Sequence, residues 1–153
     1  PGRFSRVLVD VPCTGLGALR RRPEARWRRT PGDIGSLAGL QRELLASALD
    51  ATAPGGVVAY VTCSPHLAET RLVVADVLKK RDDVTQLDAR DAVRSGILPA
   101  RQSEAELGSG PAVQLWPHVH GTDAMFIALL RTHEDSPPAH RAGTTAEEGS
   151  RTS

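Results

Sequence analysis

The 153-residue sequence contains little cysteine and few aromatic residues. Its two cysteines cannot support the disulfide-dense scaffold of a small secreted protein. A Cys-x-x-Cys pair is absent, which argues against a structural zinc site. With only 3% aromatics, the core must be built from Leu, Val, Ala and Ile. The formal net charge of +1 indicates no class of partner.

Long apolar runs are also missing. None approaches the roughly 20 residues that a membrane-spanning helix needs. The printed residues contain no signal peptide pattern, so we expect a cytoplasmic protein with neither a membrane nor a metal partner. The chain opens with Pro1-Gly2 and enters a strand almost at once, so we expect it to be part of a longer protein. A Pro, Ser, Thr, Glu and Gly composition predicts a disordered tail over 133–153, after a folded part over 1–132.

The hydrophobic pattern predicts alternating strands and helices, which is typical of an α/β fold. Leu37, Leu40, Leu44 and Ala48 are expected on the buried face of the first long helix, with Ser36 as its N-cap. The predicted strands are Arg6–Asp10, Val57–Thr62, Val84–Leu87 and Ala124–Arg131, and the predicted helices are Ser36–Ala53, Leu67–Lys80 and a short one near Ala89–Arg94.

Each cysteine follows a predicted strand and adjoins a proline, in "RVLVDVPCTGLG" and "GGVVAYVTCSP". A right-handed crossover would make the two strands parallel neighbours, about 4.8 Å apart. Cys13 and Cys63 would then share one crevice at the carboxyl edge of the sheet, with sulfurs within roughly 10 Å. Asp10 would be a buried acid at the same edge. A small buried core residue is the alternative interpretation of either cysteine alone.

An arginine-rich segment follows the first cysteine. One interpretation is a solvated surface. The other is an RNA-binding segment, in which the arginines neutralise phosphates and the tryptophan stacks on a base. The residues concerned are Arg20, Arg21, Arg22, Arg26, Trp27, Arg28 and Arg29.

Four segments together resemble the Sun/Nop-type (RsmB-like, Fmu) RNA cytosine-C5 methyltransferases, and most closely the bacterial branch that acts on small-subunit ribosomal RNA. They are "DVPCTGLGALRRRPEARW", "LQRELLASAL", "PGGVVAYVTCSPHLAET" and "LWPHVHGTDAMF". The resemblance implies that Cys63 attacks carbon 6 of the cytosine, Cys13 helps to release the product, and Asp10 contacts the base. DNA cytosine methyltransferases use their Pro-Cys cysteine as the nucleophile, so the Thr-Cys cysteine favours RNA.

The same resemblance implies a Rossmann-like fold that uses S-adenosylmethionine, here its carboxyl-terminal half only, with parallel strands and a final antiparallel strand. Asp10 and Pro12 would border the cofactor. The Gly-rich loop of such folds is absent, and "GLG" at 15–17 is read as a turn. We therefore expect the isolated chain to bind the cofactor negligibly, to lack activity, and to self-associate through the unpaired edge of "RVLVD". A non-catalytic RNA-binding module is the alternative function.

The remaining polar residues near these motifs are interpreted as structural. Gln41 and Glu69 would brace the loops, while Ser64 and Pro65 would shape the turn that carries Cys63. Asp123 would be structural, with a base-pocket role as the alternative. Too few ligands accompany His118 and His120 for a metal site, so contacts with substrate or backbone are expected.

Overall fold

One mixed sheet organises the chain, and the computed structural model describes residues 2–96 and 106–135 of it. The strand order is β1-β2-β5-β3, and the short β4 pairs with β5 from outside this path. The strands are β1 (Phe4–Asp10), β2 (Thr52–Thr62), β3 (Val84–Leu87), β4 (Val113–Gln114) and β5 (Phe126–Thr132). The α-helices are α1 (Ala25–Arg28), α2 (Pro31–Ala51), α3 (Arg71–Leu78), α4 (Arg90–Ser95) and α5 (Pro117–His120), and the 3-10 helices are η1 (Leu16–Ala18) and η2 (Leu67–Glu69).

The strand directions agree with the predicted arrangement. β1 and β2 are parallel neighbours, whereas β5 runs antiparallel to both β2 and β3. Strands β1, β2 and β3 therefore run parallel to one another. The final strand, β5, lies between β2 and β3 and runs antiparallel to them. This confirms the predicted α/β fold.

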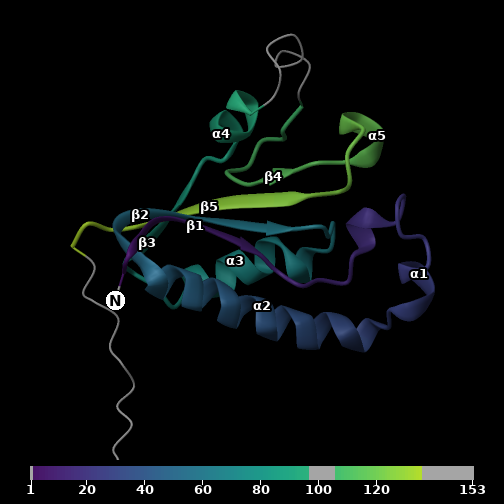
Figure 1. Cartoon of the computed structure of the whole chain (residues 1–153), viewed down its shortest axis with the longest axis horizontal. Coiled ribbons are helices and arrows are strands. Elements are labelled where there is room, and N and C mark those ends of the chain that lie inside the picture. The colour runs from purple at the N-terminus through teal and green to yellow at the C-terminus, as the bar shows by residue number, and fades with distance from the viewer. Residues whose placement is uncertain (1, 97–105, 136–153) are drawn as a thin grey trace, which may run out of the picture.

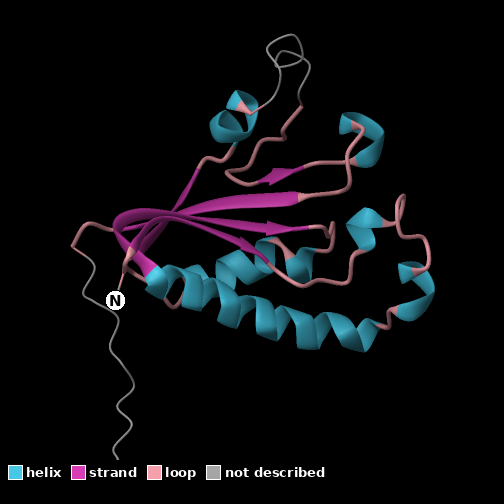
Figure 2. Ribbon diagram, viewed as in Figure 1, coloured by secondary structure: helices cyan, strands magenta, loops and turns pink. Residues whose placement is uncertain are grey.

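Helices cover the sheet unequally. Figure 1 shows α2 and α3 along one face of the sheet, whereas α4 and α5 lie away from these helices, on the side of β4. Figure 2 shows that the long helix α2 runs beneath much of the sheet. The main core lies on the side of α2 and α3, where Tyr60 and Phe126 meet edge to face with their ring centroids 6.2 Å apart.

The start of α2 differs from the prediction. The helix begins at Pro31, and Thr30 rather than Ser36 is its N-cap. Thr30 and Asp33 form a capping box, in which the Thr30 backbone N–H donates to Asp33 Oδ2 at 2.8 Å. Proline at the first helical position needs no hydrogen bond from its nitrogen, so it extends the helix upstream rather than breaking it.

The buried face of α2 was also predicted incorrectly. Its fully buried line consists of Ala38, Gln41, Leu45 and Leu49, whereas Leu40 is 43% exposed. Leu37, Leu44 and Ala48 are half-buried beside that line. Gln41 occupies a core position because its side-chain Nε2 donates to the Pro12 carbonyl and to Glu69 there, and a hydrophobic pattern cannot anticipate a buried polar residue.

The bounds of several other elements also differ from the prediction. The predicted helix Leu67–Lys80 is divided at Thr70 into η2 and α3, which turns Glu69 into the interior. Residues 54–56, expected to end a helix, belong to a longer β2. β4 was not predicted because two residues carry no periodic signal. The predicted tail over 133–153 lies largely outside the described residues, as does 97–105 of the polar stretch before β4.

The outer edge of β1 has no neighbouring strand in the described part of the chain. Leu8 in this strand is 71% exposed. An unpaired strand edge is a template for association with another chain, so self-association at β1 stays a prediction. None of the described helices is long and apolar enough to cross a membrane.

The corrected face of α2 is tested by a pair of leucines on that helix. Leu45→Ala should lower the free energy of unfolding by about 2–5 kcal/mol, because Leu45 is fully buried and its truncation leaves a cavity. Leu40→Ala, which removes the same atoms from an exposed position, should cost less than about 1 kcal/mol. Urea unfolding monitored by circular dichroism measures both, and equal losses would contradict the assignment of the buried face.

Candidate active site

Two loops at one end of the sheet bring the cysteines together. β1 ends at Asp10 and β2 at Thr62, and the parallel register pairs Asp10 with Val61. The chain therefore leaves both strands at the same edge, and Cys13 and Cys63 follow within three residues. Their sulfurs lie 3.3 Å apart, so the predicted proximity is confirmed. Neither cysteine is in a disulfide, and both are half-buried.

The contact between the sulfurs sets the protonation of the pair. Hydrogen bonding with Cys63 lowers the pKa of Cys13 to about 6, with a further contribution from the Gly15 N–H, which donates to Cys13 Sγ at 3.3 Å. Burial opposes this shift. The same contact, together with burial, raises the pKa of Cys63. At neutral pH the pair therefore shares one proton between its two sulfurs.

A fully buried carboxylate joins the two cysteine loops. Glu69 Oε1 accepts from the Thr14 backbone N–H at 2.8 Å, and Glu69 Oε2 accepts from the Thr14 hydroxyl at 2.6 Å. The Ser64 hydroxyl also donates to Oε2 at 2.6 Å. Thr14 follows Cys13 and Ser64 follows Cys63, so one side chain fixes the residue after each cysteine.

Further hydrogen bonds hold this carboxylate in place. Gln41 Nε2 donates to Glu69 Oε1 at 3.3 Å and to the Pro12 carbonyl at 2.9 Å. The Tyr60 hydroxyl donates to the Glu69 carbonyl at 2.7 Å. Ser64 Oγ accepts from the His66 N–H at 3.1 Å, which directs its own proton to Glu69. The predicted bracing by Gln41 and Glu69 and the role of Ser64 in the turn are thus confirmed.

Gly17 joins a third loop to the site. Its N–H donates to the Cys63 carbonyl and its carbonyl accepts from the Ala124 N–H, both at 2.9 Å. A β-carbon at Gly17 would lie only 2.2 Å from the Ala124 carbonyl oxygen, so only glycine allows this approach. Gly15 adopts a φ of +74°, which confirms the predicted turn at "GLG".

The expectation of a buried Asp10 is wrong. Asp10 and Pro12 are both exposed at the end of β1. Within the described part of the chain the Asp10 carboxylate has no hydrogen bond or ion pair, and β1, which it ends, is the edge strand of the sheet. The contact of Asp10 with the base, and the position of Asp10 and Pro12 beside the cofactor, stay predictions.

The arginine-rich segment is divided into two groups by its contacts. Arg20 Nε and Arg21 Nε donate to Asp123 at 2.8 and 2.7 Å, and Arg21 Nη2 makes a further contact. Arg21 first, then Arg20, lowers the pKa of Asp123 to about 2. Arg29 donates to the carbonyls of Thr14 and Cys13 at 3.1 and 3.4 Å. These three arginines position loops, and Asp123 has the structural role that was predicted for it.

The second group lies in and around α1. Arg22, Arg26 and Arg28 are exposed and form no ion pair among the described residues. Trp27 is 83% exposed, and the Arg26 guanidinium lies 5.6 Å from its ring centroid. The cationic and aromatic part of the segment therefore faces solvent beside the cysteine loops.

The histidines contact the backbone and a neighbouring ring. His120 Nδ1 accepts from the Trp116 N–H at 2.9 Å, and its Nε2 lies 3.1 Å from the Glu106 carbonyl. The His118 and Trp116 ring centroids are 6.1 Å apart. No group of three or more potential metal ligands occurs within 2–96 and 106–135. Trp116 was not singled out from the sequence, because an isolated aromatic before a proline has no periodic context.

Comparison with known proteins identifies the family of this chain. The model of the family described as 16S rRNA methyltransferase RsmB/F matches residues 1–131. The chain belongs to this family. The predicted resemblance and the Rossmann-like methyltransferase fold are thereby confirmed.

Individual relatives agree with this membership. Rv1407 of Mycobacterium tuberculosis, whose name describes a methyltransferase, is 64% identical over 131 residues, which are 86% of this chain and 27% of that protein. The mouse 28S rRNA (cytosine-C(5))-methyltransferase is 36% identical over 151 residues, 95% of this chain and 19% of the mouse protein. The crystal structure of NSun6 from Pyrococcus horikoshii with SFG superposes with a TM-score of 0.63 at 29% identity, covering 84% of this chain and 30% of that one. The chain thus spans about a quarter of the first of these relatives.

The shared proton predicts a pH dependence of thiol reactivity. In the wild type, alkylation of Cys13 by iodoacetamide should be half-maximal near pH 6, because the contact with Cys63 favours the thiolate above that value. Cys63→Ala removes the donor, so the midpoint should move upward, whereas Cys63→Ser keeps a donor and should shift it less. Peptide mapping across a pH series measures all three, and an unchanged midpoint in Cys63→Ala would contradict the paired assignment.

The Glu69 carboxylate is tested by an isosteric change. Glu69→Gln replaces an acceptor oxygen with an N–H₂ group that faces donors from Thr14, Gln41 or Ser64, so the free energy of unfolding should fall by about 2–3 kcal/mol. Glu43→Gln, on the exposed side of α2, should change it by less than about 0.5 kcal/mol. Chemical denaturation of both variants provides the comparison, and a Glu69→Gln variant as stable as the control would exclude the bracing role.

Proposed function

We propose that this chain forms the substrate-facing part of the catalytic domain of an S-adenosylmethionine-dependent ribosomal RNA cytosine-C5 methyltransferase of the cytoplasm. The observation that carries the proposal is the 3.3 Å contact between Cys13 and Cys63 at the ends of two parallel strands. Membership of a family of 16S rRNA methyltransferases, and a relative named for cytosine-C5 methylation of 28S rRNA, support the reaction and the class of RNA.

Cys63 is the nucleophile in this proposal. Its thiol loses a proton to the Cys13 thiolate 3.3 Å away while its sulfur forms a bond to carbon 6 of the cytosine. The electron pair of the C5=C6 bond forms a C4=C5 bond, and the pair of the C4=N3 bond moves to N3, which takes a proton from the Asp10 carboxyl in its protonated form. Carbon 5 thereby becomes enamine-like and nucleophilic. The raised pKa of Cys63 is overcome because proton transfer and attack occur together.

Cys13 acts again at the end of the reaction. It returns the first proton to solvent and, as a thiolate, removes the proton from the substituted carbon 5. The C5=C6 bond then re-forms, the C6–S bond breaks, N3 returns its proton to Asp10, and Cys63 leaves as a thiolate. The lowered pKa of Cys13 suits this base, since the thiolate is already populated near neutral pH.

S-adenosylmethionine supplies the methyl group when it is bound. The residues present fit one wall of its site: Asp10 and Pro12 are exposed at the carboxyl end of β1, and the Asp10 carboxylate has no partner among the described residues. Ligands of open α/β sheets bind at this edge. The Pyrococcus horikoshii NSun6 structure was solved with SFG, an analogue of this cofactor, which supports the same choice here.

RNA is the proposed partner, and the exposed part of the arginine-rich segment is its proposed contact. Arg22, Arg26 and Arg28 would neutralise phosphates while Trp27 stacks on a base. Arg20 and Arg21 are engaged by Asp123, so they would contact RNA only with their remaining N–H groups.

The rival function is a non-catalytic RNA-binding module on the same fold. The exposed cations and Trp27 suit that role equally well. Cysteine reactivity discriminates between the two, because only an enzyme of the proposed type forms a covalent bond to the pyrimidine.

The two cysteines should behave differently in the full-length protein. Cys63→Ala should abolish methyl transfer and all covalent complexes with substrate RNA, because no bond to carbon 6 can form. Cys13→Ala should instead accumulate a covalent protein–RNA complex: without the contact that raises its pKa, Cys63 can lose its proton to solvent and still attack, whereas release lacks its base. Denaturing gel electrophoresis with labelled RNA and S-adenosylmethionine measures both.

The opposite pattern would reverse the roles. A complex that persists in Cys63→Ala and disappears in Cys13→Ala would identify Cys13 as the nucleophile. RNA binding without any covalent complex, in the wild type and in both variants, would support the non-catalytic module.

A further inference from the structure

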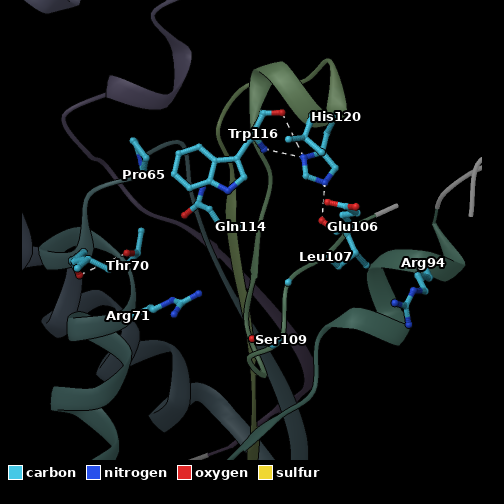
Figure 3. Close-up of a pocket in the computed structure, with 13 residues that line it drawn as sticks. Pro65, Thr70, Arg71, Arg94, Glu106, Leu107, Ser109, Gln114, Trp116 and His120 are labelled. Atoms are coloured by element: carbon cyan, nitrogen blue, oxygen red, sulfur yellow. Dashed lines mark hydrogen bonds between the residues drawn. The ribbon is translucent and has the colours of Figure 1, made fainter. Parts of the chain in front are cut away.

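A cavity of about 890 Å³ lies beside the turn that carries Cys63. Residues from η2 and the start of α3 form one wall, and β4 and α5 form the opposite wall (Figure 3). The cavity begins at Pro65, which is two residues beyond Cys63. Two residues of chain span at most about 7 Å, so the cavity lies within reach of whatever adjoins the target base.

An aromatic ring forms part of the wall opposite α3. Trp116 is 38% exposed and lines the cavity. Its backbone is fixed by His120, whose Nδ1 accepts from the Trp116 N–H and whose Nε2 lies 3.1 Å from the Glu106 carbonyl. The ring of His118 lies close to the indole, with 6.1 Å between the ring centroids. The backbone that carries the indole is therefore fixed, and the indole itself is accessible to a ligand.

A cation from α3 lines the same cavity as this ring. Arg71, the first residue of α3, is exposed, lines the cavity and forms no ion pair within the described residues. Figure 3 shows its side chain extending from the start of α3 into the open space below the indole of Trp116. Arg94 lies at the far end, where it pairs weakly with Asp91 at 3.7 Å. Among the described lining residues the acidic one is Glu106, which is exposed.

We infer that this cavity binds the nucleotide next to the target cytosine in single-stranded RNA. The inference rests on the proposed function, since it takes Cys63 as the position of the target. The base stacks on Trp116 and the phosphate binds Arg71. Unpaired RNA bases are commonly held by aromatic rings, with arginine on the backbone. The volume is within the range of small-molecule sites, which is ample for one nucleotide.

The stacking contact is tested by a double-mutant design in the full-length protein. The probes are A4CA4 RNA and two versions of it with an abasic residue on the 5′ or the 3′ side of the cytidine. Trp116→Ala should weaken binding of intact RNA by about 10-fold, because one stacked base is lost. It should not weaken binding of the abasic RNA that lacks that base. Trp116→Phe keeps a ring and should restore most of the affinity.

Fluorescence anisotropy measures each dissociation constant, and the salt dependence tests the arginine. Arg71→Gln should reduce the slope of log Kd against log salt by about 0.7, the value for one phosphate contact on a single strand. Lys80→Gln, an exposed cation just beyond α3 and outside the cavity, should leave the slope unchanged. Equal weakening of intact and abasic RNA by Trp116→Ala, or no weakening at all, would overturn the assignment.

A separate readout distinguishes this inference from the proposed function. The wild type is incubated with A4CA4 RNA whose cytidine is replaced by 5-fluorocytidine, with S-adenosylmethionine, and covalent adducts are counted. Coupling between Trp116 and the neighbouring base without any adduct would support the nucleotide site and count against the catalytic proposal. Adducts without that coupling would support catalysis and overturn the nucleotide site.

Discussion

The buried carboxylate of Glu69 is the interaction on which the candidate site depends. It accepts hydrogen bonds from residues that directly follow each cysteine, and no other described side chain joins both loops in this way. A buried charge is costly unless its hydrogen-bonding capacity is used. Thr14, Ser64 and Gln41 use it. The hydrogen bonds that offset this cost therefore also fix the two loops that hold the sulfurs close together.

The sheet supplies the second constraint. Because β1 and β2 are parallel, their carboxyl ends meet at one edge, and residues that are 50 apart in sequence are brought into contact. Gly17 then joins this edge to the segment before β5, since its lack of a side chain lets three backbones converge. The cysteine pair consequently sits on fixed loops, and its two sulfurs share a proton that a mobile pair would not share.

The sequence was informative where a pattern repeats or a motif is local. Apolar runs before each cysteine identified β1 and β2, and their parallel pairing followed from a right-handed crossover. Burial of Gln41 and exposure of Leu40 were missed, because polar partners rather than periodicity decide which face of α2 turns inward. The burial of Asp10 was predicted incorrectly since it depends on what packs over β1. Partners distant in sequence, such as Asp123 for Arg20, leave no local signal.

The central claim is that Cys63, held opposite a Cys13 thiolate, bonds to the pyrimidine. The most direct test is mass spectrometric mapping of the wild-type adduct formed with substrate RNA that contains 5-fluorocytidine. The account predicts that the modified pyrimidine is attached to the peptide that carries Cys63, with Cys13 unmodified. Attachment to Cys13, or an RNA–protein complex with no modified cysteine, would contradict it.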